Sequence, residues 1–409
     1  MTSNCCRIFE LSPAGALLIL IMAEIGWNCL MLIWICINFN INRRRLLTSI
    51  DCSNDTPIVS IVVPAFNEEK VIASAISSLL ASSYPNLEIV VVDDGSTDRT
   101  AAIAEKIAAL DFRVSVLRLE TNAGKAHALN AGFAATRSDY VVVVDADTIV
   151  DRNFISHIIE PLFFGKAQAV CGNIKVGNTV NIKAAFQSLE YSWANGATKT
   201  LQSAFIGITT LPGAGSAFIK QIVLDAGGFA PTTRAEDTEL TLKLVQSGFR
   251  IVYQPHALAY TEAPTTWISL FRQRHRWIYG NMQCTRQVRL KKIVAAPGLL
   301  LFLFHNFLAI PLSLILAISS LLSLFSDSII PIFELFVASS FVKIAAISLI
   351  DSQDTRKFER IICALLMRLI WPTFLIVPYT ASIMNIFQRR PVGWHKLERT
   401  ADAINPVTR

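Results

Sequence analysis

VVVVDADT, residues Val141–Thr148, joins four valines to a pair of aspartates. Four consecutive valines are typical of a strand that is buried on both faces. Asp145 and Asp147 are two positions apart, so on an extended segment their side chains point the same way. Two carboxylates so close together repel one another unless a cation lies beside them, and Mg²⁺ is commonly held by one or two carboxylates together with substrate phosphates. The stretch therefore predicts a metal site at the end of a buried strand, with a hydrated acidic turn as the alternative.

The sequence around this stretch alternates between apolar strands and amphipathic helices. Strands are expected at residues 58–63, 87–92, 113–117 and 140–144, and helices at residues 68–81, 97–110 and 124–136. Apolar strands separated by helices predict an α/β fold with a mostly parallel, Rossmann-like sheet and helices on both faces. Ligands bind such sheets outside the carboxyl ends of the strands, where Asp93, Asp94, Asp145 and Asp147 are expected. The glycine spacing of a dinucleotide-binding motif or a P-loop is absent.

Two strongly apolar regions flank this central part. Residues 13–39 and 295–387 are largely apolar, and a membrane-spanning helix needs about 20 apolar residues. The first region predicts one span, and the second predicts three, near residues 299–325, 329–350 and 361–387. The expected parts are an N-terminal transmembrane helix with a basic flank (1–45), a globular domain (57–290), C-terminal transmembrane helices (295–387) and a basic tail (388–409).

The basic residues predict how the chain is oriented in a cell membrane. Arg43–Arg45 follow the first apolar region directly, so the positive-inside rule predicts a signal anchor and a cytoplasmic globular domain. Four spans would then put the C-terminus outside, whereas the basic segment Gln388–Thr400 favours the inside, and the sequence leaves the number of C-terminal spans open. The 8 cysteines lack CxxC spacing, which fits a reducing compartment. The net charge of +6 without a basic–aromatic array predicts contact with anionic lipid and no nucleic acid.

Six motifs occur in a fixed order along the central domain. They are PAFNEE (64–69), DDGSTD (93–98), NAGKAHALNAG (122–132), DAD (145–147), AEDTEL (235–240) and QRHRW (273–277). This ordered set resembles that of the membrane-bound, processive family 2 glycosyltransferases, and the resemblance extends over residues 57–280. Within that family, the chain length and the WIYGN segment at residues 277–281 are most similar to those of the poly-β-1,6-N-acetylglucosamine synthases.

The resemblance implies a GT-A fold that uses a UDP-sugar, with Mg²⁺ or Mn²⁺ as cofactor. The residues it assigns to the UDP-sugar are Ala65, Phe66, Glu68, Asp93, Asp94, Lys125 and Asp145, and the residue it assigns to the metal is Asp147. Phe66 replaces the tyrosine of some relatives, which removes a hydroxyl group from this position. The segment Pro212–Phe218 resembles the glycine-serine loop that shapes the acceptor pocket in the family.

The resemblance also implies that the catalytic residues are Asp237, Gln273, Arg276 and Trp277. Asp237 would be the general base that deprotonates the acceptor hydroxyl, although the helix dipole alone also favours an acidic residue at a helix N-terminus. Arg276 would pair with the departing diphosphate, and Trp277 would stack against the acceptor sugar, with Gln273 beside it. Relatives carry threonine at the position of Ala235, which leaves the aspartate unchanged.

The arginines beside this motif have a simpler interpretation. Arg272 and Arg274 fit a charged anchor at the membrane surface, because they lie shortly before the long apolar region. The sequence does not distinguish this anchor from a role in the site.

The predicted function is an inverting, processive glycosyltransferase that polymerises a β-linked polysaccharide, poly-N-acetylglucosamine, and takes part in its export. Its expected partners are a UDP-sugar donor, the growing polysaccharide and membrane lipid, and the sequence leaves open whether a small membrane subunit takes part. One alternative is a non-processive enzyme that moves a sugar to a lipid carrier, and the QxxRW motif argues against it. The other is a membrane channel with a nucleotide-sugar sensor domain, against which the DxD motif, Asp237 and QxxRW argue together.

Overall fold

The structure, a computed structural model, describes residues 56–179, 181–322 and 357–393, together with Met22, Gly26, Cys29, Ile33, Arg399 and Ala401. The chain divides into two compact units. One contains Met1–Arg44 and Phe307–Val377, and the other, larger unit contains Arg45–Asn306 and Pro378–Arg409. The sheet and all the predicted site residues belong to the larger unit.

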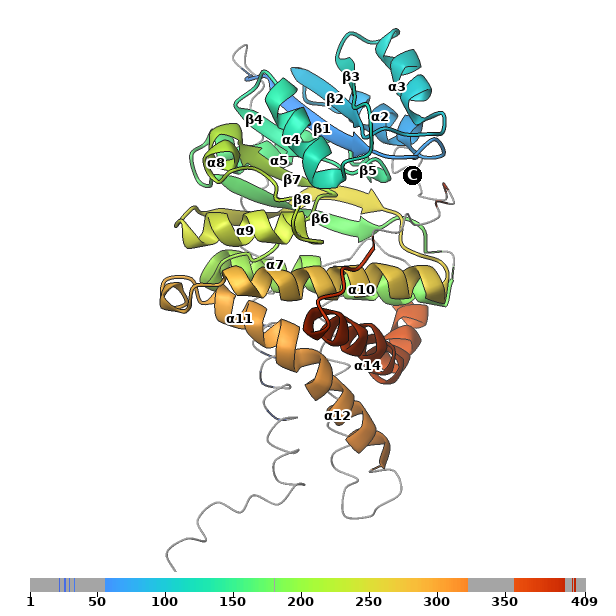
Figure 1. Ribbon diagram of the computed structural model, residues 1–409, viewed down its shortest axis with the longest axis vertical. Coiled ribbons are helices and arrows are strands. Elements are labelled where there is room, and N and C mark those ends of the chain that lie inside the picture. Colours follow the sequence, from blue (N-terminus) through green and yellow to red (C-terminus); the bar gives the residue numbers. More distant parts are fainter. Residues whose placement is uncertain are drawn as a thin grey trace, which may run out of the picture. The chain divides into compact units, whose positions relative to one another are not determined.

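Eight strands form one mixed sheet in the part of the chain that the structure describes, in the order β3-β2-β1-β4-β7-β6-β8-β5 (Figure 1). They are β1 (Val59–Ala65), β2 (Leu87–Asp93), β3 (Val114–Arg118), β4 (Tyr140–Val143), β5 (Thr148–Val150), β6 (Ala169–Val176), β7 (Ser216–Ile219) and β8 (Ile251–Thr261). Strands β1 to β4 pair in parallel, as do β6 and β8. β7 is antiparallel to β4 and β6, and β5 is antiparallel to β8. The four predicted strands and the mostly parallel sheet are confirmed.

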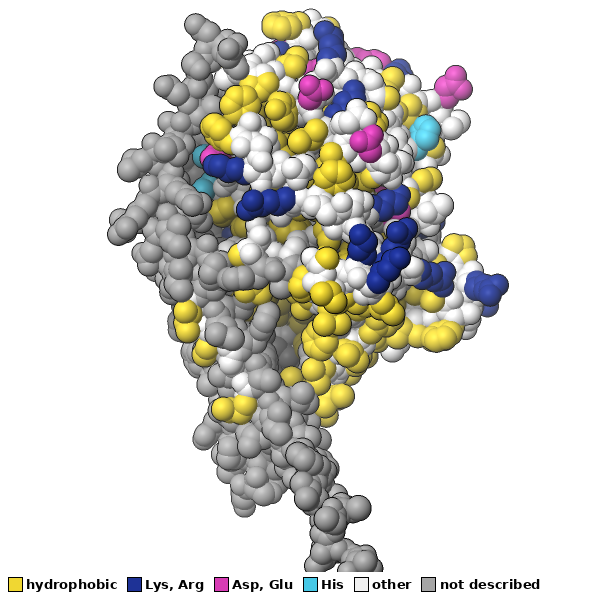
Figure 2. Space-filling model, turned by 90° about the vertical axis from the view of Figure 1, so that its left-hand side faces the viewer, with side chains coloured by type: hydrophobic (Ala, Val, Ile, Leu, Met, Phe, Trp, Pro, Cys, Tyr) yellow, Lys and Arg dark blue, Asp and Glu magenta, His cyan; other side chains and the backbone are white. Residues whose placement is uncertain are grey.

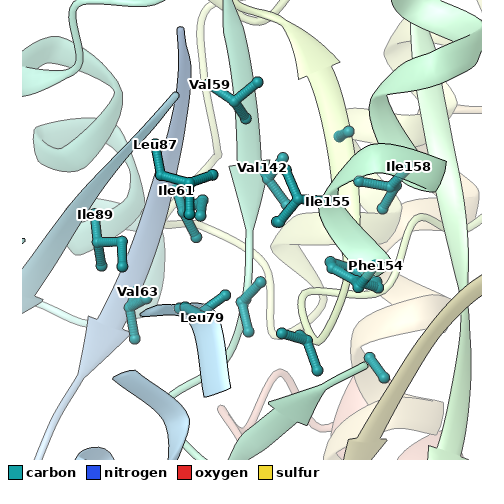
Figure 3. Close-up of a cluster of buried hydrophobic side chains, with 14 of the residues drawn as sticks. Val59, Ile61, Val63, Leu79, Leu87, Ile89, Val142, Phe154, Ile155 and Ile158 are labelled. Carbon is teal, nitrogen blue, oxygen red and sulfur yellow. The ribbon is translucent and has the colours of Figure 1, made fainter. Parts of the chain in front are cut away.

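The valine run shows why helices cover both faces of this sheet. Successive side chains of a strand point to opposite faces. Val142 and Val144 accordingly join a buried cluster on one face, part of which is shown in Figure 3, whereas Val141 and Val143 join a separate cluster on the other. The helices whose side chains contribute to the first cluster are α2 (Ile72–Leu80), α3 (Thr100–Ala108) and α5 (Phe154–Phe163). Those that contribute to the second are α4 (Lys125–Ala135), α8 (Lys220–Asp225) and α9 (Glu236–Gln246).

The remaining helices follow β6 and β8. After β6 the chain forms α6 (Ile182–Tyr191), the π-helical η1 (Ser192–Thr198), α7 (Lys199–Leu201) and the π-helical η2 (Gln202–Ile206). After β8 it forms α10 (Trp267–Cys284), η3 (Thr285–Gln287), η4 (Leu290–Lys292), α11 (Gly298–Phe304), η5 (His305–Ala309), α12 (Ile310–Leu322) and α14 (Lys357–Phe387). The side chain of Thr266 caps α10 by accepting a hydrogen bond from the backbone N–H of Ser269, at 3.2 Å. This cap fixes where the helix with the QRHRW motif begins.

Two helical stretches among the described residues are long and apolar enough to cross a membrane. They are Gly298–Ile318 and Ile370–Phe387, which overlap the first and third predicted C-terminal spans. The predicted spans at residues 13–39 and 329–350 lie almost entirely outside the described residues. Exposed hydrophobic side chains also gather on the surface, and Lys and Arg side chains cluster beside them (Figure 2). Because the structure describes only two of the four predicted spans, the multi-pass arrangement stays a prediction.

Candidate active site

A cavity of about 340 Å³ lies beside the carboxyl ends of β1, β2 and β4. The predicted site residues that line it are Ala65, Phe66, Glu68, Asp94, Lys125, Asp145, Asp147 and Arg276. The described lining also includes Glu236, the neighbour of Asp237, but not Asp93, Asp237, Gln273 or Trp277 themselves. Most of the predicted site residues thus meet at the carboxyl ends of the strands, as the sequence indicates.

Asp94 holds the loop that begins α4. Its two carboxylate oxygens accept hydrogen bonds from the backbone N–H groups of Ala123 and Gly124, at 3.0 and 2.8 Å. Gly124 has a φ of +96°, a backbone conformation that residues other than glycine rarely adopt. The neighbouring Asp93 is buried and accepts from the N–H of Ser96 at 3.3 Å, while its Oδ1 has no hydrogen-bond partner among the described residues. Asp94 therefore shapes the wall of the cavity, and Asp93 retains one free acceptor.

Lys125, the first residue of α4, forms an ion pair across the cavity. Its Nζ lies 2.5 Å from Oδ1 of Asp145. Burial lowers the pKa of Lys125, but the carboxylates of Asp145 and Glu236 raise it by more, so the pKa lies above its ordinary value and the amine stays charged. A Cβ at Gly213 would lie 2.5 Å from this Nζ. Gly213, in the segment Pro212–Phe218, therefore leaves room for the ion pair between Lys125 and Asp145.

The sequence predicts that Asp145 and Asp147 lie on one extended segment. In the structure they lie instead on the turn between β4 and β5. The backbone N–H of Thr148 donates to the carbonyl of Asp145 at 3.0 Å and closes this turn. Both side chains still line the cavity, yet each pairs with a different cation. Asp145 pairs with Lys125, whereas Asp147 pairs with Arg399, whose Nε also lies 3.6 Å from Oε2 of Glu68. Each carboxylate thus has a cationic side chain of its own beside it, which offsets the repulsion between the two negative charges.

The carboxylates fit a divalent ion of the kind that needs few protein ligands. The described residues contain no group of three or more His, Cys, Asp or Glu side chains arranged around a common point. Mg²⁺ does not require such a group, because it is usually held by one or two carboxylates, substrate phosphates and water. Asp147 is 8% exposed at the cavity wall, and Asp145 lies two residues away. The donor set is therefore sufficient for a metal that binds together with a diphosphate.

Asp237 lies in the first turn of α9, beside Glu236. Burial and, to a smaller extent, the Glu236 carboxylate raise the pKa of the Asp237 carboxyl to about 6, although Lys125 and Arg276 act in the opposite direction. Its Oδ1 accepts a hydrogen bond from the backbone N–H of Thr238 at 2.7 Å. A carboxyl group with this pKa can take up and release a proton near neutral pH.

The QRHRW residues divide between the two sides of α10. Arg276 lines the cavity, and its Nη1 lies 3.5 Å from the carbonyl oxygen of Arg234. Gln273 is buried, and its Oε1 has no hydrogen-bond partner among the described residues. Trp277 is half-buried and contacts Arg274 and Tyr191 away from the described lining of the cavity. Arg276 therefore lies at the cavity, whereas Trp277 lies beside Arg274 and Tyr191.

The two neighbouring arginines differ from one another. Arg272 is exposed, as a surface anchor requires. Arg274 is buried at 5% exposure and pairs with Glu190 of α6 at 2.6 Å. The interpretation of Arg274 as a membrane-surface charge is therefore wrong, because its guanidinium is turned into the protein.

Direct contacts connect α9 to α10. The N–H of Arg234 donates to Oε1 of Gln283 at 3.1 Å, and Sγ of Cys284 lies 3.6 Å from the carbonyl oxygen of Ala235. A Cβ at Gly280 would lie 2.7 Å from the carbonyl carbon of Arg234. The backbone that leads to Asp237 thus packs against the helix that carries Arg276.

Comparison with known proteins identifies the domain that holds this site. Residues 60–226 match the sequence model of the family described as "Glycosyl transferase family 2". This segment of the chain resembles the catalytic domain of family 2 glycosyltransferases. It is 34% identical over 223 residues to the poly-beta-1,6-N-acetyl-D-glucosamine synthase of Staphylococcus aureus (strain COL), covering 54% of each chain. It is also 34% identical over 234 residues to the "Probable glycosyltransferase YdaM" of Bacillus subtilis (strain 168), covering 56% of each.

Comparison with solved structures extends this likeness to the fold. The mannosyltransferase PcManGT of Pyrobaculum calidifontis, solved with GDP-Man and Mn²⁺, aligns with 92% of this chain and 100% of its own, with a TM-score of 0.58 and 18% identity. This match confirms the predicted GT-A fold. The chain spans about half the length of the curated relatives that it matches.

The larger unit contains two residues at the site that the sequence does not reveal. Arg399 reaches Asp147 from a position 252 residues further along the chain, and the sequence marks it only as part of a basic tail. Glu190 carries no motif, although it pairs with a residue inside QRHRW. No local signal could have found either residue, because each is defined by a partner far away in the sequence.

Proposed function

We propose that the chain is an inverting glycosyltransferase that builds a β-linked polysaccharide, with UDP-N-acetylglucosamine as its donor. Its likeness to the staphylococcal synthase supports the choice of product and donor. The observation that carries the proposal is that Asp237, a carboxyl of raised pKa, lies close enough to Lys125 and Arg276 to be influenced by both of their charges. Transfer from a nucleotide sugar uses this combination, since an acceptor hydroxyl loses a proton while a negatively charged diphosphate departs.

Each step of the proposed transfer falls to a residue at the site. Asp237 accepts the proton of the acceptor hydroxyl, whose oxygen forms a bond to the anomeric carbon of the donor. The bond between that carbon and the diphosphate breaks on the opposite face, which inverts the configuration. Arg276 donates hydrogen bonds to the leaving diphosphate. A divalent ion, Mg²⁺ or Mn²⁺, held by Asp147 with Asp145 beside it, would neutralise further charge on that group when bound.

The remaining predicted residues bind the two substrates. We assign the nucleoside to the cavity wall formed by Ala65, Phe66 and Glu68 and to the acidic pair Asp93 and Asp94. We assign the diphosphate to Lys125, whose side chain also lines the cavity. We assign the terminal sugar of the growing polysaccharide to Gln273 and Trp277, because an indole ring offers an apolar face to a sugar ring.

We also propose that the domain works at the cytoplasmic face of a cell membrane. The apolar stretches Gly298–Ile318 and Ile370–Phe387 support membrane attachment, as does the segment that precedes the first of them. In that segment, Leu290 and Val294 are 74% and 91% exposed and alternate with Arg289, Lys291 and Lys292. Exposed apolar and basic side chains together suit the surface of an anionic membrane.

The test is incorporation of labelled sugar by membranes that contain the full chain, supplied in turn with UDP-N-acetylglucosamine, UDP-glucose and GDP-mannose plus Mg²⁺ or Mn²⁺. Long products made from UDP-N-acetylglucosamine would support the proposal. A single lipid-linked sugar would favour a non-processive transferase. Binding of UDP without turnover of any donor would favour a sensor.

The pKa of Asp237 predicts how this activity depends on pH. A general base works only when deprotonated, so kcat/KM is expected to rise with pH up to about pH 6 and to level off above it. Below that pH the rate should fall about tenfold per pH unit. Initial rates of UDP release from about pH 4.5 to 8, with the enzyme's stability checked at each pH, measure the profile. A flat profile between about pH 5 and 7 would remove Asp237 from the role of base.

Arg399 is expected to compete with a divalent ion for Asp147, since both cations need the same carboxylate. Arg399→Gln should therefore strengthen Mn²⁺ binding by about fivefold, the factor that corresponds to an ion pair of about 1 kcal/mol. Titration of the purified protein, with free Mn²⁺ followed by electron paramagnetic resonance, measures this without any turnover. Arg389→Gln, which changes an exposed arginine, is the matched control. Unchanged or weaker Mn²⁺ binding by the Arg399 variant would contradict the competition.

A further inference from the structure

The end of α6 holds the indole ring of Trp277 through two adjacent residues. Glu190 forms an ion pair with Arg274, whose Nη2 lies 2.6 Å from Oε2 of Glu190. The guanidinium carbon of Arg274 lies 4.5 Å from the centroid of the Trp277 ring. The ring of Tyr191 lies 6.4 Å from the same indole, tilted by 35°. Two of the neighbours of Trp277 are therefore set by α6 rather than by α10 alone.

Burial makes the orientation of Arg274 depend on Glu190. The Arg274 side chain is 6% exposed and that of Glu190 is 25% exposed, so the guanidinium cannot exchange its partner freely for water. A buried charge without a partner is costly, which favours an orientation in which the guanidinium reaches the carboxylate. A planar guanidinium held in this way can lie over an aromatic ring, and the attraction between them restrains the ring as well.

The position of α6 relative to α10 is itself fixed by hydrogen bonds from two other residues, the cap of α6 and one in its second half. Nδ2 of Asn181, the cap of α6, donates to the carbonyl oxygen of Thr265 at 3.1 Å. Nε2 of Gln187 donates to the carbonyl oxygen of Pro264 at 2.9 Å. Both acceptors immediately precede α10, so the two helices are joined at the start of α10 as well as beside Trp277. The Glu190–Arg274 pair therefore acts between two helices that are already held in register.

We propose that Glu190 and Arg274 are positioning residues that fix the angle of the Trp277 ring and, through it, the placement of the acceptor sugar. The inference rests on the proposed function, because it concerns the polymer that Trp277 would hold. A freely turning indole would release the end of the polymer more often between additions. Loss of the ion pair should therefore shorten the product more than it slows the release of UDP.

The first measurement observes the ring directly and needs no activity. The full chain is labelled with 5-fluorotryptophan, and the ¹⁹F resonance of Trp277 is assigned with Trp277→Phe. Glu190→Gln and Arg274→Met are expected to shift or broaden this resonance, whereas Arg272→Met, a change to an exposed arginine of the same helix, is expected to leave it unchanged. Glu190→Asp, which keeps the carboxylate, should resemble the parent more closely than Glu190→Gln does. If Arg274→Met does not fold, Glu190→Gln carries the test.

The second measurement compares product length with turnover. Glu190→Gln and Arg274→Met are expected to shorten the mean product by about fivefold, which is the factor that corresponds to the loss of one cation–π contact of about 1 kcal/mol. UDP release should change by less than product length, and Arg272→Met should make parental product. An unchanged Trp277 resonance, or a shifted resonance with parental product length, would overturn the inference. A parent chain that makes no polymer from any donor would instead overturn the proposed function, and this is established before the variants are compared.

Discussion

Asp237→Asn is expected to lower kcat by about 10²- to 10⁴-fold, the contribution typical of a general base. The substitution removes the acceptor of the proton but keeps the shape of the side chain, so the cavity and its ion pairs should persist. Two features single out this carboxyl. Its pKa is raised to about 6, chiefly by burial and also by Glu236, and Lys125 and Arg276 lie close enough to act on its charge. UDP release and sugar incorporation, measured with saturating donor and acceptor, give the size of the loss.

The control for this prediction lies in the same helix. Glu239 is acidic and buried, but it pairs with Lys243 at 2.9 Å and is not part of the described cavity lining. Glu239→Gln should retain parental kcat within a few-fold, and both variants should bind UDP with parental affinity. Polymerisation by Asp237→Asn at the parental rate would show that another group takes the proton.

The strands around the first motif could be predicted because their residues carry the whole signal locally. Val141 to Val144 alternate between two buried clusters, and only a strand covered on both faces needs apolar residues at every position. The order of the strands places Asp94, Asp145 and Asp147 beside one cavity, as expected from the carboxyl ends of neighbouring parallel strands. Pattern and spacing were sufficient there.

The turn that carries the DxD motif could not be predicted from the same pattern. The period of two holds only while the backbone stays extended, and β4 ends at Val143, before the first aspartate. The partners of the two carboxylates, Lys125 and Arg399, come from α4 and from beyond α14. A local pattern contains no information on such distant cations, so the sequence did not reveal the two ion pairs.

The position of Arg274 could not be predicted either, because it depends on a residue that is distant in the sequence. Its sequence neighbours are basic and precede an apolar region, which favours a membrane-surface position. The residue that decides its position is Glu190, which lies 84 residues earlier in the chain. Helical geometry separates Arg272 from Arg274 by about 200°, so the two arginines of one motif point to different surroundings.

Gly280→Ala is expected to lower kcat by about 10²-fold, the cost that a displacement of about 1 Å can have at a catalytic site. An added Cβ would lie 2.7 Å from the carbonyl carbon of Arg234 and 2.8 Å from the backbone nitrogen of Ala235. Both atoms belong to backbone, which cannot turn aside as a flexible side chain can. The segment that must move leads directly into Glu236 and Asp237, while α10 carries Arg276.

The sign of this prediction opposes the ordinary effect of the substitution. Alanine in place of glycine within a helix usually stabilises the helix by about 1 kcal/mol, so an open position would gain stability. At Gly280 the contact with α9 should outweigh that gain, and the melting temperature should fall together with kcat. Asn281→Ala, at the next and only half-buried position, is the matched control and should retain both. Parental turnover in Gly280→Ala would mean that α10 can move away from α9 without disturbing Asp237.

UDP binding separates this effect from a general loss of structure. The residues assigned to the nucleotide, among them Asp94 and Lys125, lie on the β1–β4 half of the sheet and make no contact with Gly280. Gly280→Ala should therefore bind UDP with parental affinity at a temperature below its melting point, while its turnover is low. This combination would indicate that Asp237 and Arg276 act only when α9 and α10 approach as closely as a glycine allows.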